Sequence, residues 1–206
     1  MKGKKEPALS KSERTKKRII HAAIDIISTK GIERATTREI AKKAKVANGL
    51  VSHYFPEIDR IFDEVIQEIA QEAYKSIESP PDSGSGHDKI IHMCRANLDF
   101  FSAHPRYLKC FLLFYYFCSI RANLRQMNTT LIQRAVQRCR EYLKQHFAET
   151  QRKADDRKLD AYSILIHDHL MNTVLKLEMI DHETEAAEFT ERFLANLSLL
   201  LKSGLV

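Results

Sequence analysis

Apolar residues recur every three or four positions along most of the chain, which is the spacing of one face of an α-helix. The spacing predicts helices over about 11–29, 37–44, 47–54, 58–78, 89–103, 105–120, 122–148, 156–180 and 184–202. Residues that break helices are scarce, with six glycines and five prolines in 206 residues. The sequence therefore predicts an all-α protein.

Cap residues mark the first helix boundaries in the sequence. Ser10 and Glu13, and again Thr36 and Glu39, have the S/T-x-x-E spacing of a capping box, which begins a helix. Gly31 follows the first apolar stripe and is expected to end that helix in a left-handed conformation.

The stretch 36–55 reads as two short helices joined by a turn at Lys45. Ile40 and Ala44 on the first helix, and Val51 on the second, are spaced to pack inward. The outer face of the second helix carries small, polar or aromatic groups, which suit a DNA major groove. A plain helical hairpin that binds nothing would show the same apolar spacing.

Positive charge is concentrated at the N-terminal end of the chain. Residues 1–60 hold 15 lysines and arginines against 7 aspartates and glutamates, whereas residues 61–206 hold 18 against 20. This asymmetry is the footprint of a phosphate-binding domain joined to a neutral one. A solvated basic surface is the alternative.

From about residue 15 to residue 62 the sequence resembles the DNA-binding domain of the TetR (tetracycline-repressor-like) family. The matching residues are Ala22, Ala23, Gly31, Thr36, Thr37, Arg38, Glu39, Ile40, Ala41, Ala44, Val46, Gly49, His53, Tyr54, Phe55 and Pro56. Four positions depart from the family pattern. Lys45 replaces the turn glycine, Ala47 a capping residue, Ser52 a phosphate-contacting tyrosine, and Ile58 a lysine.

The resemblance implies a three-helix helix-turn-helix domain at residues 1–57, followed by a helical ligand-binding and dimerisation domain at 58–206. It also implies a homodimer through the last two helices that binds a double-stranded DNA operator, with a repressor favoured over an activator. The expected DNA contacts are Thr36, Thr37, Arg38, Lys45, Asn48, Gly49, Leu50, Ser52, His53 and Tyr54. Arg14, Lys17 and Arg18 are further candidates for phosphate contacts.

The family's second domain holds a small-molecule effector between its fifth and eighth helices. Mapped by the resemblance, the lining draws on Phe101, Phe111, Phe114, Tyr115, Cys118, Met127, Leu131, His167 and Met171. Aromatic residues and scarce charge favour an apolar or aromatic effector. An aromatic box for a quaternary ammonium group is conceivable, although no carboxylate stands out as its partner. These residues are equally typical of an ordinary core, which would leave a ligand-independent DNA-binding dimer.

Catalysis is the remaining alternative, and the sequence gives it little support. No Gly-rich phosphate loop, nucleophile elbow or HExxH motif occurs, and His167 and His169 are spaced too closely to share a metal on one helix face. The four cysteines form no CxxC pair, which favours buried, reduced thiols. No uninterrupted apolar run reaches membrane-spanning length and no signal peptide is present, so we expect a cytoplasmic protein without catalytic residues, cofactor or metal site.

Overall fold

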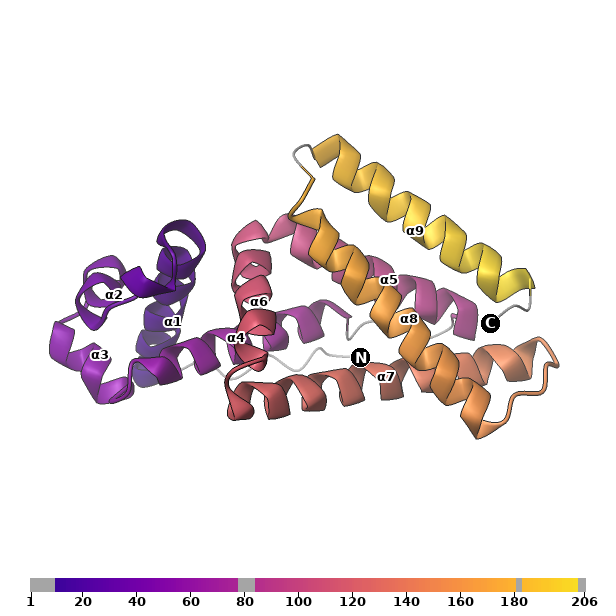
Figure 1. The fold of residues 1–206 in the computed structure, drawn as a ribbon, viewed down its shortest axis with the longest axis horizontal. Coiled ribbons are helices and arrows are strands. Elements are labelled where there is room, and N and C mark those ends of the chain that lie inside the picture. Colours follow the sequence, from indigo (N-terminus) through magenta and orange to yellow (C-terminus); the bar gives the residue numbers. More distant parts are fainter. Residues whose placement is uncertain (1–9, 78–83, 181–182, 204–206) are drawn as a thin grey trace. The chain divides into compact units, whose positions relative to one another are not determined.

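The computed structural model describes residues 10–77, 84–180 and 183–203, and every regular element within them is helical. The all-α prediction is therefore confirmed. The elements are α1 (Lys11–Lys30), η1 (Ile32–Arg34), α2 (Thr37–Ala44), α3 (Asn48–Tyr54), α4 (Asp59–Ile77), α5 (Gly86–Ala103), α6 (Pro105–Cys118), α7 (Ala122–Glu149), α8 (Asp156–Leu177) and α9 (Glu183–Ser203) (Figure 1). No helix of the described ranges is both long and apolar enough to cross a membrane.

The chain divides into two compact units, and the division falls inside α4. The first unit ends at Glu68 and the second begins at Ile69. The resemblance predicts that the N-terminal domain ends earlier, at residue 57. The first half of α4 belongs to the N-terminal unit because it is tied to α1 by two ion pairs. Lys16 pairs with Glu64 at 2.8 Å, and Lys17 pairs with Glu68 at 2.8 Å.

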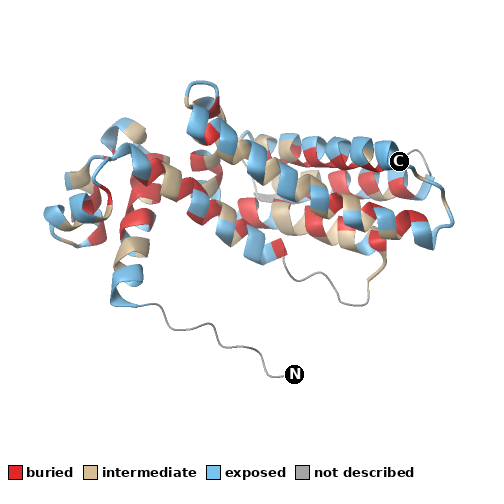
Figure 2. Ribbon diagram, turned by 90° about the horizontal axis from the view of Figure 1, so that it is seen from below, coloured by how far each residue is buried: buried red, intermediate tan, exposed pale blue. Residues whose placement is uncertain are grey.

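In the N-terminal unit, α1 packs against α2, and α2 packs against α3. Buried residues, red in Figure 2, recur along these helices at helical spacing. Their apolar side chains form one small core, whose burial supplies the main favourable term in folding. Its members include Ile19, Ile20, Ile24 and Ile27 of α1, Ile40 of α2, Val51 of α3, and Phe55.

The predicted caps are confirmed in part. Ser10 and Glu13 form the complete capping box, with N–H to side-chain distances of 2.8 and 3.2 Å. Thr36 forms half of one: its hydroxyl accepts from the Glu39 N–H at 3.3 Å, while its own N–H donates to the Arg34 carbonyl at 2.9 Å. Gly31 ends α1 with φ 87° and ψ 161°. The prediction is confirmed in part: Gly31 ends the helix with a positive φ, but its ψ lies outside the left-handed helical region because the chain leads directly into η1.

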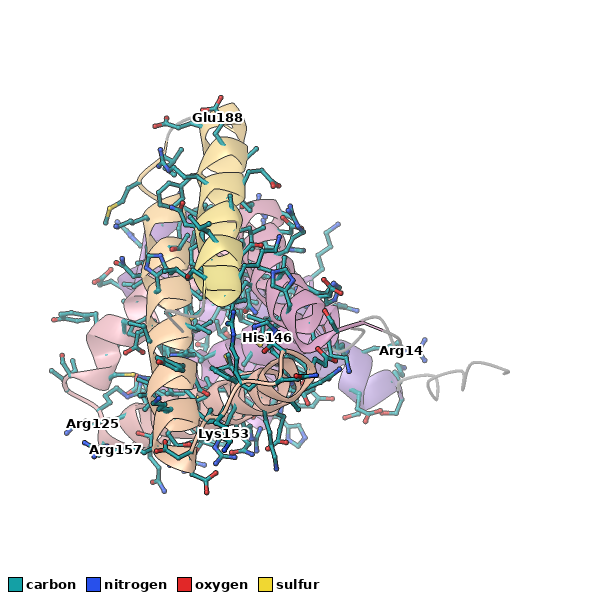
Figure 3. The ribbon with its side chains drawn as sticks, turned by 90° about the vertical axis from the view of Figure 1, so that its right-hand side faces the viewer. Arg14, Arg125, His146, Lys153, Arg157 and Glu188 are labelled. Carbon is teal, nitrogen blue, oxygen red and sulfur yellow. The ribbon has the colours of Figure 1, made fainter. Side chains whose placement is uncertain are left out.

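In the C-terminal unit, α5 is the central helix and packs against α6, α7, α8 and α9 (Figure 1). α7 also packs against α8. His146 lies below the end of α9 in Figure 3, and its Nε2 is 3.2 Å from the Leu201 carbonyl oxygen. Arg152 donates to the Leu201 and Lys202 carbonyls at 2.9 and 2.8 Å. These side chains satisfy the C-terminal end of α9.

Gly86 allows a close contact between α5 and α7. Its N–H donates to the Glu149 carboxylate at 2.9 Å, so the first turn of α5 lies against α7. A Cβ atom placed on Gly86 would lie 2.3 Å from the His146 nitrogen and 2.5 Å from the Tyr142 oxygen, both in the backbone. Backbone atoms within a helix cannot give way as a flexible side chain would.

We predict that Gly86→Ala lowers the free energy of unfolding by about 3 kcal/mol, because the added methyl forces α5 and α7 apart. Chemical denaturation followed by circular dichroism measures this loss. Gly49→Ala is the matched control, since a Cβ there meets nothing within 4 Å and alanine favours the helix. Equal stabilities of the two variants would contradict the close α5–α7 contact.

Candidate nucleic-acid interface

The outer face of α3, where the sequence predicts DNA contacts, is exposed, and the opposite face of the helix is buried. Val51 and Phe55 are buried in the core of the N-terminal unit. None of the ten residues expected at DNA is buried: seven are exposed, and Thr37, Leu50 and Tyr54 are half-buried. Gly49 faces open space, so another backbone can approach α3 closely there.

Tyr54 is anchored to the protein at the end of α3. Its hydroxyl lies 2.9 Å from the Ser12 hydroxyl and donates to the Ser12 carbonyl at 3.3 Å. The sequence placed Tyr54 among the DNA contacts, which stays a prediction, whereas this bond to α1 is a role that sequence reasoning missed. Ser12 lies 42 positions away along the chain, and no local pattern links the two residues.

The turn between α2 and α3 has Lys45 in the left-handed conformation, with φ 54° and ψ 51°. The Val46 N–H donates to the Ala41 carbonyl at 3.0 Å and the Lys45 N–H to the Lys42 carbonyl at 3.3 Å. Together these bonds form a Schellman motif, which ends a helix. Glycine adopts this conformation without strain, whereas lysine does so at a cost of about 1–2 kcal/mol.

The basic residues of α1 are largely engaged with the protein. Arg18 donates to the Ala44 and Lys45 carbonyls at 2.9 and 3.2 Å. Lys17 pairs with Glu68, whose side chain is only 6% exposed. The bond from His21, followed by that from Lys17, lowers the pKa of Glu68 to about 2 against the opposing effect of burial. Arg14 and Arg18 are both exposed, but the charged groups of Lys17 and Arg18 are bonded within the protein, so these two are weaker candidates for phosphate contacts than Arg14.

In the C-terminal unit, four of the nine expected effector residues form one aromatic cluster. The Phe111 ring lies 5.3 Å from Phe101, 5.8 Å from Phe114 and 5.2 Å from Tyr115, measured between ring centroids. The perpendicular Phe111–Tyr115 pair has the edge-to-face geometry that aromatic rings prefer. This aromatic cluster joins the end of α5 to α6.

The carboxylate of Asp168 lies near Tyr115 of the aromatic cluster. Burial, followed by the nearby Cys118 and Asp168, raises the pKa of Tyr115 to about 12. Asp168 also lies 3.2 Å from the Nδ1 atom of His167 on α8. The sequence analysis missed this carboxylate, because only the fold brings α8 beside α6. The other expected lining residues, Met127, Leu131 and Met171, are half-buried on α7 and α8.

The cysteine thiols are buried and unpaired by disulfides, as the sequence predicted. Burial raises the pKa of Cys110 and of Cys139 to about 12, and it raises that of Cys94 well above its ordinary value. Such thiols stay protonated at neutral pH, and a thiol is a poor nucleophile. Within the described ranges, no group of three or more histidine, cysteine or acidic residues is placed to hold a metal ion.

A helix-turn-helix with an exposed second helix, joined to a separate helical body, is the architecture of a DNA-binding regulatory protein. Residues 19–65 match the family model described as bacterial regulatory proteins, tetR family. Over these residues the chain matches the DNA-binding domain of the TetR family, as the sequence predicted.

A curated relative is the HTH-type transcriptional regulator BetI of Cronobacter sakazakii, which is 24% identical over 103 residues, or 48% of this chain and 51% of the relative. The chain thus spans about half the length of the curated relatives it matches. Two solved structures share the fold over 88% of this chain. The transcriptional regulator FadR of Bacillus subtilis, in complex with stearoyl-CoA, has a TM-score of 0.73 at 17% identity and is covered over 97%. A protein from Saccharomonospora viridis, in complex with choline, has a TM-score of 0.74 at 12% identity and is covered over 94%.

Proposed function

We propose that this protein is a homodimeric, effector-responsive transcriptional regulator, and that it represses from a palindromic operator. The observation that carries the proposal is the exposed face of α3, held by the buried Val51 and Phe55 on its other side. Asn48 on this face can pair with adenine through two hydrogen bonds, and the exposed Arg38 can reach phosphate or a guanine edge.

Selection of bound sequences from a random duplex pool, at a stated salt concentration, tests the DNA-binding part of the proposal. We expect a palindromic consensus with half-sites about one helical turn, ~34–36 Å, apart. Recovery of no consensus from folded protein would contradict sequence-specific regulation.

We predict that Asn48→Ala loses discrimination at one base pair of each half-site, by about 1–3 kcal/mol, because the two bonds to adenine are lost. Competition binding of single-base operator variants measures this. Gln133→Ala, an exposed amide on α7, is the control and should leave the pattern unchanged. If Asn48→Ala instead weakens all duplexes equally, Asn48 contacts phosphate.

Exposed apolar residues on the last two helices support dimerisation through α8 and α9. Leu165 is 58% exposed and Leu199 is 67% exposed, with Ile164 and Leu200 exposed beside them in sequence. Large apolar side chains gathered on an open surface are typical of a protein interface. One helix-turn-helix reads only a half-site, so a two-fold operator requires two chains.

We predict that the double variant Leu165→Glu, Leu199→Glu is monomeric, because each dimer would bury four unpaired carboxylates. Analytical ultracentrifugation measures the mass at several concentrations. Ile120→Glu is the matched control, since Ile120 is 62% exposed but follows α6. A double variant that remains dimeric would place the interface elsewhere.

The aromatic cluster and Asp168 support an effector with an apolar body and a positive charge. Aromatic faces attract organic cations, and a neighbouring carboxylate adds an opposite charge. The same fold holds choline in the Saccharomonospora viridis protein and stearoyl-CoA in the Bacillus subtilis protein. Asp168 beside Tyr115 favours the cationic class over an anionic one. Binding to the DNA-incompetent state would then shift the population away from the operator.

We predict that choline binds more tightly than 3,3-dimethylbutan-1-ol, which has the same shape and no charge. Calorimetric titration of each compound measures the difference, which we expect to be about tenfold because a cation over aromatic rings gains about 1–2 kcal/mol. Asp168→Asn should reduce that preference, and Asp160→Asn, on the same helix, is the control. Equal affinities, or no binding of either compound, would contradict a quaternary ammonium effector.

A further inference from the structure

The carbonyl groups at the C-terminal end of α2 are satisfied from two sources. Backbone N–H groups of the Schellman motif donate to the Ala41 and Lys42 carbonyls. The Ala44 and Lys45 carbonyls accept from Nη2 of Arg18, at 2.9 and 3.2 Å. One guanidinium group of α1 therefore bonds to both carbonyls that flank the turn.

The turn requires such support because its central residue is not glycine. Lys45 has φ 54° and ψ 51°, a conformation in which an L-residue brings its Cβ too close to the following carbonyl oxygen. The Ala44 and Lys45 carbonyls lie on either side of the Lys45 α-carbon. Bonds from one rigid, planar guanidinium to both oxygens fix the two peptide planes about Lys45.

The other end of α3 is held by the same helix. The Tyr54 hydroxyl bonds to the hydroxyl and carbonyl of Ser12, six residues before Arg18 on α1. Six residues of helix rise about 9 Å, so α1 holds the turn and the end of α3 at two separated points. A change at the turn would then tilt α3 about its anchored end.

We propose that Arg18 is a positioning residue for DNA reading, which holds the left-handed turn at Lys45 and thereby sets the orientation of α3. The inference rests on the DNA-binding function proposed above. Arg18 acts through the turn and not through a phosphate, because its guanidinium faces the negative end of the α2 dipole and bonds to carbonyls there. Glycine at position 45 would remove the need for this support.

A double-mutant cycle between positions 18 and 45 tests the proposal. Arg18→Met and Arg18→Lys are each made with Lys45 and with Lys45→Gly. Dissociation constants are measured for the selected operator and for an unrelated duplex of equal length, at one salt concentration. Both bonds come from Nη2, at the far end of the guanidinium, whereas a lysine side chain is shorter and ends in a freely rotating ammonium group. Arg18→Lys therefore keeps the charge and loses the fixed donor position, so it separates charge from geometry.

With Lys45 present, we expect Arg18→Met to weaken operator binding by about tenfold, as one misread base pair does, and the unrelated duplex by about threefold or less. With Lys45→Gly, the operator loss should fall to about threefold, which is the part due to charge alone. Arg18→Lys should weaken the operator in the Lys45 background and leave the unrelated duplex unchanged.

Arg14→Met is the charge-matched control, because Arg14 is an exposed cation one helical turn before Arg18. It should weaken both duplexes by a similar factor, in both backgrounds. Equal losses from Arg18→Met in the two backgrounds, or equal losses on the two duplexes, would overturn the positioning role.

Thermal melting of the wild type, Arg18→Met, Lys45→Gly and the double variant tests the turn without DNA. Arg18→Met should lower the melting temperature more with Lys45 than with Lys45→Gly, and equal shifts would contradict the coupling. If the wild-type protein selects no operator while the melting cycle shows coupling, the proposed function fails and the support of the turn stands.

Discussion

The contact of α1 with the α2–α3 pair is the constraint on which the DNA-reading surface depends. α3 has seven residues and buries only Val51 among them, too little apolar area to hold a helix in place by itself. Its orientation therefore comes from α1, through the shared core and through bonds at Arg18 and Ser12. Because that support lies behind α3, the outward face is free to carry polar residues.

In the C-terminal unit, too, the helices are buried on one side and exposed on the other, and the helices are longer. α5 is covered by four neighbours, which accounts for the buried Ile90, Cys94 and Leu98 on it. The outer faces of α8 and α9 are then left with exposed leucines, while the aromatic cluster forms where α5 meets α6. The exposed leucines support the proposed dimer surface, and the aromatic cluster supports the proposed effector site.

The sequence predicts features that depend on neighbouring residues. Ser10 begins α1 and Pro105 begins α6, because caps and helix starts are decided within one turn. Long-range partners are different, since Tyr54 and Ser12, or Tyr115 and Asp168, meet only after the helices pack. Periodicity places a residue on a face but does not name what that face meets. The sequence likewise predicts a complete capping box at Thr36. Only half of it forms, because the Thr36 N–H donates to the Arg34 carbonyl instead.

Charge illustrates how far composition can mislead about a binding surface. The surplus of basic residues over positions 1–60 points to a phosphate-binding unit, yet it does not say which cations face the phosphates. Lys16 and Lys17 are paired with acidic residues of α4, and Arg18 is bonded to the turn. A paired cation releases fewer counterions on binding, so we expect fewer phosphate contacts than the number of basic residues indicates. These basic residues instead hold α1, the turn and α4 together, which fixes the position of α3. The proposed sequence discrimination depends on that position.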